Sequence, residues 1–427
     1  MPPLRPTREQ IKRAQREGLD RMMRLAPHAP FWWARFVDAG IDPEHATAAD
    51  FVRLPTTTKA DLVADHAAHP PYGTTRTERA TAYPRFHQTS GTTGVPMRWP
   101  DTPAGWAWVT ECWAKIFTLV GTPPGEPVFF PFSFGPFLGF WAAFEGAARR
   151  GNMAIPAGGM STEARLRMLA NVEATTVCCT PTYALRMAEV AAAEGLELAS
   201  LPVERLIVAG EPGGNVAATR ERIELAWNAD CYDHWGMTEV GPLATAVEGD
   251  KDALYVLETD CVAEILRREA DEPVDAGEVG ELVVTNLGRL GSPVLRYRTG
   301  DLVRAATTPS PVGLEFLRLE GGVLGRVDDM LTVRGNNVFP SAIEAVVRRF
   351  DGVAEYRVVV TESTSLTELR VDLEPAPDAD ATSIARDVGR ALAETLNFRI
   401  AVAAVPADSL PRFEMKGKRV VREQSED

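Results

Sequence analysis

Apolar and polar positions follow two alternating patterns through most of this chain. Short apolar runs rich in β-branched residues, such as residues 175–180 and 206–208, predict buried strands. Residues 161–169 and 183–193 carry apolar side chains at helical spacing and predict helices. Strands that alternate with helices in this way are typical of layered α/β structure.

The pattern changes after residue 280. Residues 281–285 and 294–297 predict strands separated by turns, which indicates a small, mostly β subregion. Residues 305–313 are rich in Thr and Pro and predict a surface loop.

A further unit begins after residue 325. Residues 341–350 and 381–396 predict helices, and residues 355–360 and 369–373 predict strands. This is an α+β unit of about a hundred residues, a common domain size. Since 427 residues exceed what one hydrophobic core usually supports, we predict an N-terminal domain at 1–325 and a C-terminal domain at 326–427, with the boundary near 326–329.

The N-terminal segment predicts a capped helix and no targeting signal. Thr7 and Gln10 have the spacing of a capping box, followed by the apolar positions Ile11, Leu19, Met22 and Met23. The first twenty residues are charged and lack an apolar core, and the uncharged residues 128–144 are too short and too interrupted by Pro and Gly to span a membrane. We therefore expect a cytoplasmic protein without membrane partners.

Charge and cysteine content exclude two classes of partner. The chain has 45 Lys and Arg against 59 Asp and Glu, a net charge of −14, so binding to nucleic acid by charge is not expected. The five cysteines form no CxxC pair, so we predict reduced packing residues, no disulfide framework and no cysteine zinc site. The sequence leaves a homodimer open.

Three segments of the large domain have residue types suited to a nucleotide. Residues 87–96 form a Ser/Thr/Gly loop whose backbone N–H groups can hold phosphate, or a plain surface loop. In residues 233–239 an aromatic before Gly can stack on a purine and Glu239 can hold Mg²⁺, or the segment is a strand end with a capping Glu. Asp301, after Gly300, can accept hydrogen bonds from a ribose diol or can close its own turn.

Two more segments lie near and beyond the predicted boundary. Residues 325–329, continuing to 334–340, are either functional or an interdomain loop with solvated charges. Residues 411–419 are either functional or a disordered basic tail.

In this order, the five segments resemble the adenylate-forming superfamily of acyl-CoA synthetases, luciferases and adenylation domains over nearly the full length. The phenylacetate–CoA ligases are the branch that the chain resembles most. That narrower resemblance rests on residues 25–31, 54–62, 179–185 and 334–340.

The resemblance implies a role for each matching residue. The ATP phosphates are expected at Thr89, Ser90, Gly91, Thr92, Thr93 and Gly94. The rest of the nucleotide is expected at Gly210, Glu211, Pro212, His234, Trp235 and Gly236, with the ribose on Asp301 and Arg326. Catalysis is expected from Lys416, Glu239 (which holds Mg²⁺) and Thr238; the hinge is expected at Asp328, and the acid pocket at Phe134, Phe140 and Gly213.

Three departures from the family qualify these roles. The phosphate loop has Val95 and Met97 where relatives often have Lys, and only Arg98 is basic. Residues 247–250 offer no zinc ligands of the kind that some relatives carry, so we expect no zinc. Lys418 competes with Lys416, and we favour Lys416 because Arg419 then has the family's spacing.

The implied reaction uses ATP, Mg²⁺ and CoA. The acid attacks the α-phosphate to form an acyl-adenylate, and CoA then takes the acyl group as the C-terminal domain rotates. The aromatic-rich residues 129–144 favour an aryl acid, although at least half of these rings are expected to be core. Two alternatives remain: an adenylating enzyme whose acceptor is an amine, a carrier protein or another small nucleophile, and an inactive binding homologue.

Overall fold

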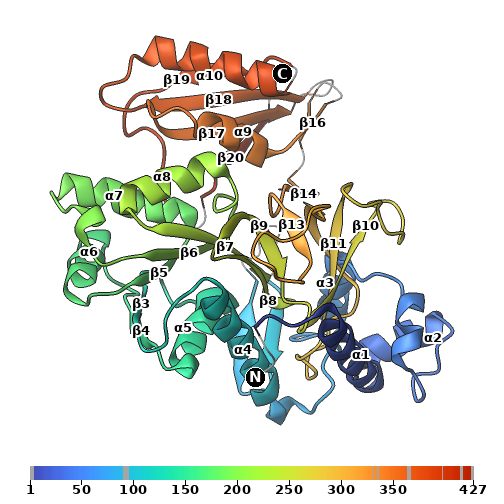
Figure 1. Ribbon diagram of the computed structural model, residues 1–427. Helices are drawn as coiled ribbons and strands as arrows, with labels where there is room; N and C mark the ends of the chain where they lie inside the picture. The colour runs from blue at the N-terminus through green and yellow to red at the C-terminus, as the bar shows by residue number, and fades with distance from the viewer. Residues whose placement is uncertain are drawn as a thin grey trace.

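The computed structural model describes residues 4–89, 96–329, 331–333, 336–362, 367–396, 398–413 and 417–424. Within these ranges the chain forms a large body and a smaller unit, drawn in orange and red, that lies against one side of it (Figure 1). The α/β prediction for the large part and the α+β prediction for the small part are confirmed.

An eight-stranded sheet forms the centre of the large body, in the order β13-β9-β8-β7-β6-β5-β3-β4. Its strands are β3 (Pro127–Phe130), β4 (Met153–Pro156), β5 (Thr176–Cys179), β6 (Arg205–Ala209), β7 (Asp230–Met237), β8 (Gly241–Val247), β9 (Asp250–Val256) and β13 (Arg318–Glu320). Strands β3 to β7 pair in parallel, and β8, β9 and β13 extend the sheet antiparallel. The carboxyl ends of β6 and β7 therefore lie side by side, and open α/β sheets bind ligands at such ends.

Helices pack on both faces of this sheet because its parallel strands are apolar on both sides. One face packs against α4 (Pro103–Leu119) and α5 (Leu138–Arg150), and the other against α6 (Thr162–Asn171), α7 (Pro181–Ala193) and α8 (Ala217–Trp227). In β5, Cys178 belongs to the first cluster, whereas Val177 and Cys179 belong to the second, as the two-residue period of a strand requires. The strands predicted at 175–180 and 206–208 and the helices predicted at 161–169 and 183–193 are confirmed, and all five cysteines are free and buried.

The β subregion is a four-stranded antiparallel sheet in the order β10-β11-β12-β14. Its strands are β10 (Cys261–Leu266), β11 (Val279–Asn286), β12 (Tyr297–Arg304) and β14 (Gly325–Arg326). The strand predicted at 294–297 was wrong in its bounds, because Arg296 has a left-handed φ of +46° and β12 begins only at Tyr297. The division predicted at 325/326 stays a prediction, and Arg326 itself pairs with Asp301 in this sheet.

The N-terminal helices pack beside the β subregion. They are α1 (Arg8–Leu25), α2 (Pro30–Asp38) and α3 (Lys59–Ala68), with short 3₁₀ turns η1 (Ala26–His28), η2 (Ala48–Arg53) and η3 (Ala80–Ala82). The predicted Thr7–Gln10 capping box is present, and Ile11, Met22 and Met23 are buried. A hairpin of β1 (Arg85–Gln88) and β2 (Arg98–Asp101) then leads into α4. A last 3₁₀ turn, η4 (Leu198–Ser200), lies between α7 and β6.

The small unit has its own sheet and its own core. The sheet order is β19-β18-β17-β20, formed by β17 (Val353–Glu362), β18 (Thr367–Pro375), β19 (Ala401–Ala404) and β20 (Val420–Gln424). The other elements are the hairpin β15 (Leu331–Val333) and β16 (Asn336–Val338) and the helices α9 (Pro340–Val347) and α10 (Ala381–Leu396). Its buried apolar cluster has members only from Leu331 to Ile400, so it is separate from the clusters of the large body.

The helix predicted at 381–396 has those bounds, whereas the one predicted at 341–350 ends three residues earlier. In the ranges that the structure describes, every helix is too short or too polar to cross a membrane.

Candidate active site

Glycines shape the loop that follows β6. Gly210 and Gly213 both have positive φ, at +94° and +149°, which L side chains rarely adopt. A Cβ on Gly213 would lie 2.5 Å from the Cβ of Pro181 at the start of α7. These two positions accept only glycine without rearrangement, and they hold Glu211 beside the first turn of α7.

The carboxylate of Glu211 contacts backbone rather than open solvent. Its Oε1 accepts a hydrogen bond from the Thr182 N–H at 2.8 Å, and its Oε2 accepts one from the Gly417 N–H at 2.5 Å. The family resemblance implied that Glu211 and Pro212 bind the nucleotide; the structure adds a contact from Glu211 to the C-terminal segment that the motif did not suggest.

Asp301, Arg326 and Trp235 form one cluster at the junction of the two sheets. Arg326 Nη1 donates to Asp301 Oδ1 at 2.8 Å, and the indole Nε1 of Trp235 donates to Asp301 Oδ2 at 2.8 Å. Burial is the largest single influence and disfavours the charge of Arg326, but the carboxylates of Asp301, Asp329 and Asp328 together outweigh it and raise the Arg326 pKa. The structure thus brings together three predicted residues that are far apart in sequence.

Glu239 is buried and lies near Tyr297. The Tyr297 hydroxyl donates to Glu239 Oε1 at 3.3 Å. Burial first, and the Glu239 carboxylate second, raise the pKa of Tyr297 well above its ordinary value, so the hydroxyl stays protonated and remains a donor. Among the described residues, Glu239 Oε2 has no hydrogen-bond or ion-pair partner, and a carboxylate oxygen is a ligand that a hard cation prefers.

His234 is held in the core. Its Nδ1–H donates to the Ala244 carbonyl at 2.9 Å, and its ring centroid lies 4.3 Å from that of Trp113. Burial lowers the pKa of His234 to about 3, so the imidazole is neutral at physiological pH. Its neighbour Gly236 accepts no side chain easily, because a Cβ there would lie 2.9 Å from the Gly241 carbonyl oxygen.

Arg289 and Asp101 support the site and were missed by the sequence reasoning. Their two hydrogen bonds are both 2.8 Å long, and both side chains are fully buried. Arg289 also donates to the carbonyls of Thr238 at 2.6 Å and Glu239 at 3.2 Å. Burial opposes the charge of Asp101, but Arg289 and His87 outweigh it and lower the Asp101 pKa. No motif marks Arg289, which lies between Gly288 and Leu290 in the sequence.

The phosphate loop is described only at its base. The Thr89 N–H donates to the Met97 carbonyl at 3.0 Å. The Met97 N–H donates to the Thr89 hydroxyl, also at 3.0 Å. The predicted residues Ser90, Gly91, Thr92, Thr93 and Gly94 lie outside the described residues.

The aromatic-rich segment forms one connected cluster. The Phe134 ring lies 4.6 Å from Phe132 and 4.5 Å from Trp141, and the Phe140 ring lies 4.5 Å from Phe132. These rings are partly buried against the core, whereas Phe129 and Phe130 are fully buried. The predicted pocket residues Phe134 and Phe140 therefore share one aromatic surface.

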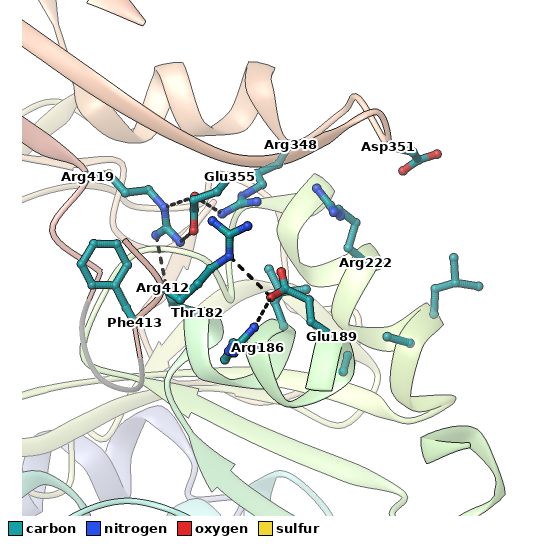
Figure 2. Close-up of a pocket in the computed structure, with 14 residues that line it drawn as sticks. Thr182, Arg186, Glu189, Arg222, Arg348, Asp351, Glu355, Arg412, Phe413 and Arg419 are labelled. Atoms are coloured by element: carbon teal, nitrogen blue, oxygen red, sulfur yellow. Dashed lines mark hydrogen bonds and ion pairs between the residues drawn. The ribbon is translucent and has the colours of Figure 1, made fainter. Parts of the chain in front are cut away.

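The C-terminal segment lies against α7. Arg419 donates from Nη1 to the Thr182 hydroxyl at 3.1 Å and forms two hydrogen bonds with Glu355, at 2.8 and 3.0 Å (Figure 2). These contacts border a cleft of about 220 Å³ between α7, α8 and the small unit, which does not include the predicted nucleotide-binding residues. Lys416 lies outside the described residues, and Lys418 is exposed.

Asp328 follows the site cluster directly. Its carboxylate is exposed and lies 3.7 Å from Arg326 Nη2, an ion pair that solvent screens. The predicted hinge residue thus lies between Arg326, the arginine predicted at the ribose site, and β15, the first strand of the small unit.

Comparison with known proteins places this geometry in a family. A model described as AMP-binding enzyme matches residues 45–288, and a model described as AMP-binding enzyme C-terminal domain matches residues 335–424. The chain therefore belongs to the AMP-binding enzymes, the adenylate-forming superfamily.

Within that superfamily the chain belongs to a branch like the phenylacetate–CoA ligases. It is 30% identical over 372 residues to the phenylacetate-coenzyme A ligase of Thermus thermophilus, covering 86% of this chain and 82% of the relative.

Two crystal structures of 2-hydroxyisobutyryl-CoA ligase show different states of that enzyme, and the present structure can be compared with each. The postadenylation state in complex with 2-HIB-AMP superposes with a TM-score of 0.92, at 29% identity over 98% of this chain and 90% of that one. The thioesterification state of the same enzyme, with 2-HIB-AMP and CoA, gives 0.73 at 30% identity, over 98% and 91%. The two units of the present structure are therefore arranged as in the postadenylation state.

Proposed function

We propose that this protein activates an aromatic carboxylic acid with ATP as an acyl-adenylate and transfers the acyl group to CoA in the cytoplasm. The observation that carries the proposal is the buried cluster of Asp301, Arg326 and Trp235 beside Glu239. It combines a ribose-binding carboxylate, an arginine and a cation-binding carboxylate where the carboxyl end of β7 meets the antiparallel sheet of β12 and β14.

The residues present fit the nucleotide. Asp301 accepts from Arg326 with one oxygen and from Trp235 with the other, so its carboxylate is fixed at the place where the resemblance expects the ribose. We propose that Arg326 binds the ribose together with Asp301, to which it donates at 2.8 Å. The Trp235 indole is fixed at its edge by Asp301, which leaves a ring face of defined orientation for the adenine.

The residues present also fit Mg²⁺ and the reaction. Glu239, oriented by Tyr297 and by Arg289 through the backbone, would hold the ion. Bound there, Mg²⁺ would neutralise charge on the transferring phosphate. Thr238 would present its hydroxyl next to Glu239, and Lys416 would neutralise charge that develops on the attacked phosphate. The acid would lie against the Phe134–Phe140 surface.

A panel assay tests the proposal. The enzyme is incubated with ATP, Mg²⁺ and a set of aryl and short aliphatic acids, and acid-dependent exchange of pyrophosphate into ATP is measured with and without CoA. We expect exchange with an aryl acid and thioester formation only when CoA is present. Exchange without thioester would indicate an amine or carrier-protein acceptor, and no exchange with any acid would indicate an inactive binding homologue.

Glu239→Gln tests the cation site. The amide keeps the shape of the side chain but removes the charge that attracts Mg²⁺. We expect adenylate formation to be nearly abolished at ordinary Mg²⁺ while the thermal unfolding midpoint stays close to that of the wild type. Glu248→Gln, a charge change elsewhere in the large domain, is the control. Full activity of Glu239→Gln would remove Glu239 from the site.

A further inference from the structure

Two hydrogen bonds join the two units at the first turn of α7, and a third, within the large body, holds Glu211 in place there. Glu211 holds the backbone N–H of Thr182 with one oxygen and that of Gly417 with the other, at 2.8 and 2.5 Å. The Thr182 hydroxyl accepts from Arg419 at 3.1 Å. We call Glu211, Thr182, Gly417 and Arg419 the α7 latch.

The start of a helix suits a carboxylate. The first N–H groups of α7 have no partner within the helix, and the helix dipole adds a partial positive charge there. Glu211 therefore keeps its hydrogen bond to the Thr182 N–H even while the small unit is elsewhere. Both of its oxygens receive N–H donors, an arrangement that a carboxylate completes and an amide cannot, because the amide has only one acceptor oxygen.

The segment that reaches α7 is closely packed and held from its own side. A Cβ on Gly417 would lie 2.6 Å from Arg419 Nη1 and 3.2 Å from the Thr182 hydroxyl. Arg419 is held in place by its two bonds to Glu355 and lies 5.4 Å from the Tyr356 ring centroid. The latch therefore joins two preformed surfaces, and only the bonds between them must form or break.

We propose that Glu211 is a positioning residue that holds the C-terminal domain in the conformation that forms the adenylate. Gly417 directly follows Lys416 in the sequence, so a bond to the Gly417 amide holds the chain next to the predicted catalytic lysine. The arrangement that contains this bond superposes on a postadenylation state far better than on a thioesterification state. The latch must then release before the acyl group is transferred, and Glu211 favours the first half-reaction over the second. This part rests on the proposed function.

Glu211→Gln separates the two half-reactions. With phenylacetate as the probe acid, we expect adenylate formation to fall about 10- to 100-fold, the size expected for one lost hydrogen bond to a charged group. Thioester formation from supplied phenylacetyl-adenylate and CoA should change by less than about twofold. Glu189→Gln is the matched control: it is the same change on α7, in ion pairs to Arg186 and Arg412, and should alter neither half-reaction more than about twofold.

A distance measurement tests the latch without turnover. All five native cysteines are buried, so Met153→Cys in the large body and Arg386→Cys on α10 offer two exposed sites for spin labels. We expect the unliganded protein to show one main label-to-label distance, and Glu211→Gln to lower the ratio of that population to the others about tenfold. Gly417→Ala should shift it in the same direction, because the added Cβ displaces Arg419 from Thr182.

The outcomes separate the latch from the proposed function. If phenylacetate and every other acid fail as substrates, the distance distributions still decide whether Glu211 holds the two units together. Identical distributions in wild type and Glu211→Gln, or equal slowing of both half-reactions, would overturn the proposal. A shift in the distribution together with selective loss of adenylation would support it.

Discussion

Two arginine–carboxylate pairs of similar geometry have different surroundings. Arg289 and Asp101 are fully buried inside the large body and connect β2 to the backbone of Thr238 and Glu239. Arg419 and Glu355 are also paired at 2.8 Å, but both belong to the small unit and face α7.

The difference follows from what each pair must do. A buried charge left without its partner is strongly destabilising. Arg289 and Asp101, which order the site, therefore both lie within the large body and are not separated when the small unit moves. The pair of the small unit is complete by itself, and it reaches the large body through the neutral Thr182 hydroxyl. Domain rotation therefore breaks the Arg419–Thr182 hydrogen bond but leaves the Arg419–Glu355 pair intact.

The largest effect is expected at the predicted lysine of the small unit. Lys416→Ala should lower adenylate formation by roughly a thousandfold or more, because the ammonium stabilises charge that develops only in that transition state. Thioester formation from supplied acyl-adenylate should be spared. Lys418→Ala, at the neighbouring exposed lysine, is the control and should cost far less. The reverse order would make Lys418 the catalytic group.

The fixed pair should dominate stability. Asp101→Ala leaves Arg289 charged and unpaired in the core, which should lower the free energy of unfolding by about 3–5 kcal/mol. Denaturant unfolding measures this, with Asp252→Ala as the control, because Asp252 pairs with Arg220 while being 78% exposed and should cost at most about 1 kcal/mol. Equal losses in the two variants would show that burial does not distinguish these pairs.

The ribose site should affect ATP binding and little else. Asp301→Ala removes hydrogen bonds to a charged group worth about 1.5–3 kcal/mol each, so the KM for ATP should rise at least about tenfold. Asp329→Ala, whose more exposed carboxylate lies 4.0 Å from Arg326, is the matched control and should leave KM nearly unchanged. An unchanged KM in Asp301→Ala would mean that the residue only organises its own turn.

The smallest effect is expected at Asp328, the predicted hinge between the large body and the small unit. Asp328→Pro fixes φ at about −65°, so a hinge that needs two conformations is restricted to one of them. We therefore expect one half-reaction to slow more than the other. Asp328→Ala removes the same exposed carboxylate but leaves φ free, and it should alter neither rate appreciably. The measurement is the single-turnover rate of adenylation and of thioester formation. Equal slowing of the two rates in Asp328→Pro would argue against a hinge at residue 328.

Local patterns predicted most of the fold. The capping box at Thr7 and the helix at 381–396 depend on neighbouring residues, and both were correct. The strand predicted at 294–297 failed because Arg296 is held in a left-handed conformation by distant partners, Leu54 and Glu264. No property of residues 294–297 alone contains that information.

The site was predictable only in part for the same reason. The motifs named Asp301, Arg326 and Trp235 because a family resemblance assigned them, and the structure joins them. The bond from Gly417 to Glu211 crosses 206 positions of sequence and depends on how the two units meet. Periodicity and composition carry no signal for such a contact.

The separate core of the small unit has a consequence for recombination and engineering. Because the buried cluster between Leu331 and Ile400 shares no member with the large body, its composition can diverge without disturbing the nucleotide site. A graft of this unit from a relative needs a compatible core only within itself. It must match its host at a few polar positions, among them the partners of Thr182 and Glu211. The protein is in this respect modular: the substrate-binding and lysine-bearing parts can be inherited, exchanged or redesigned as separate pieces.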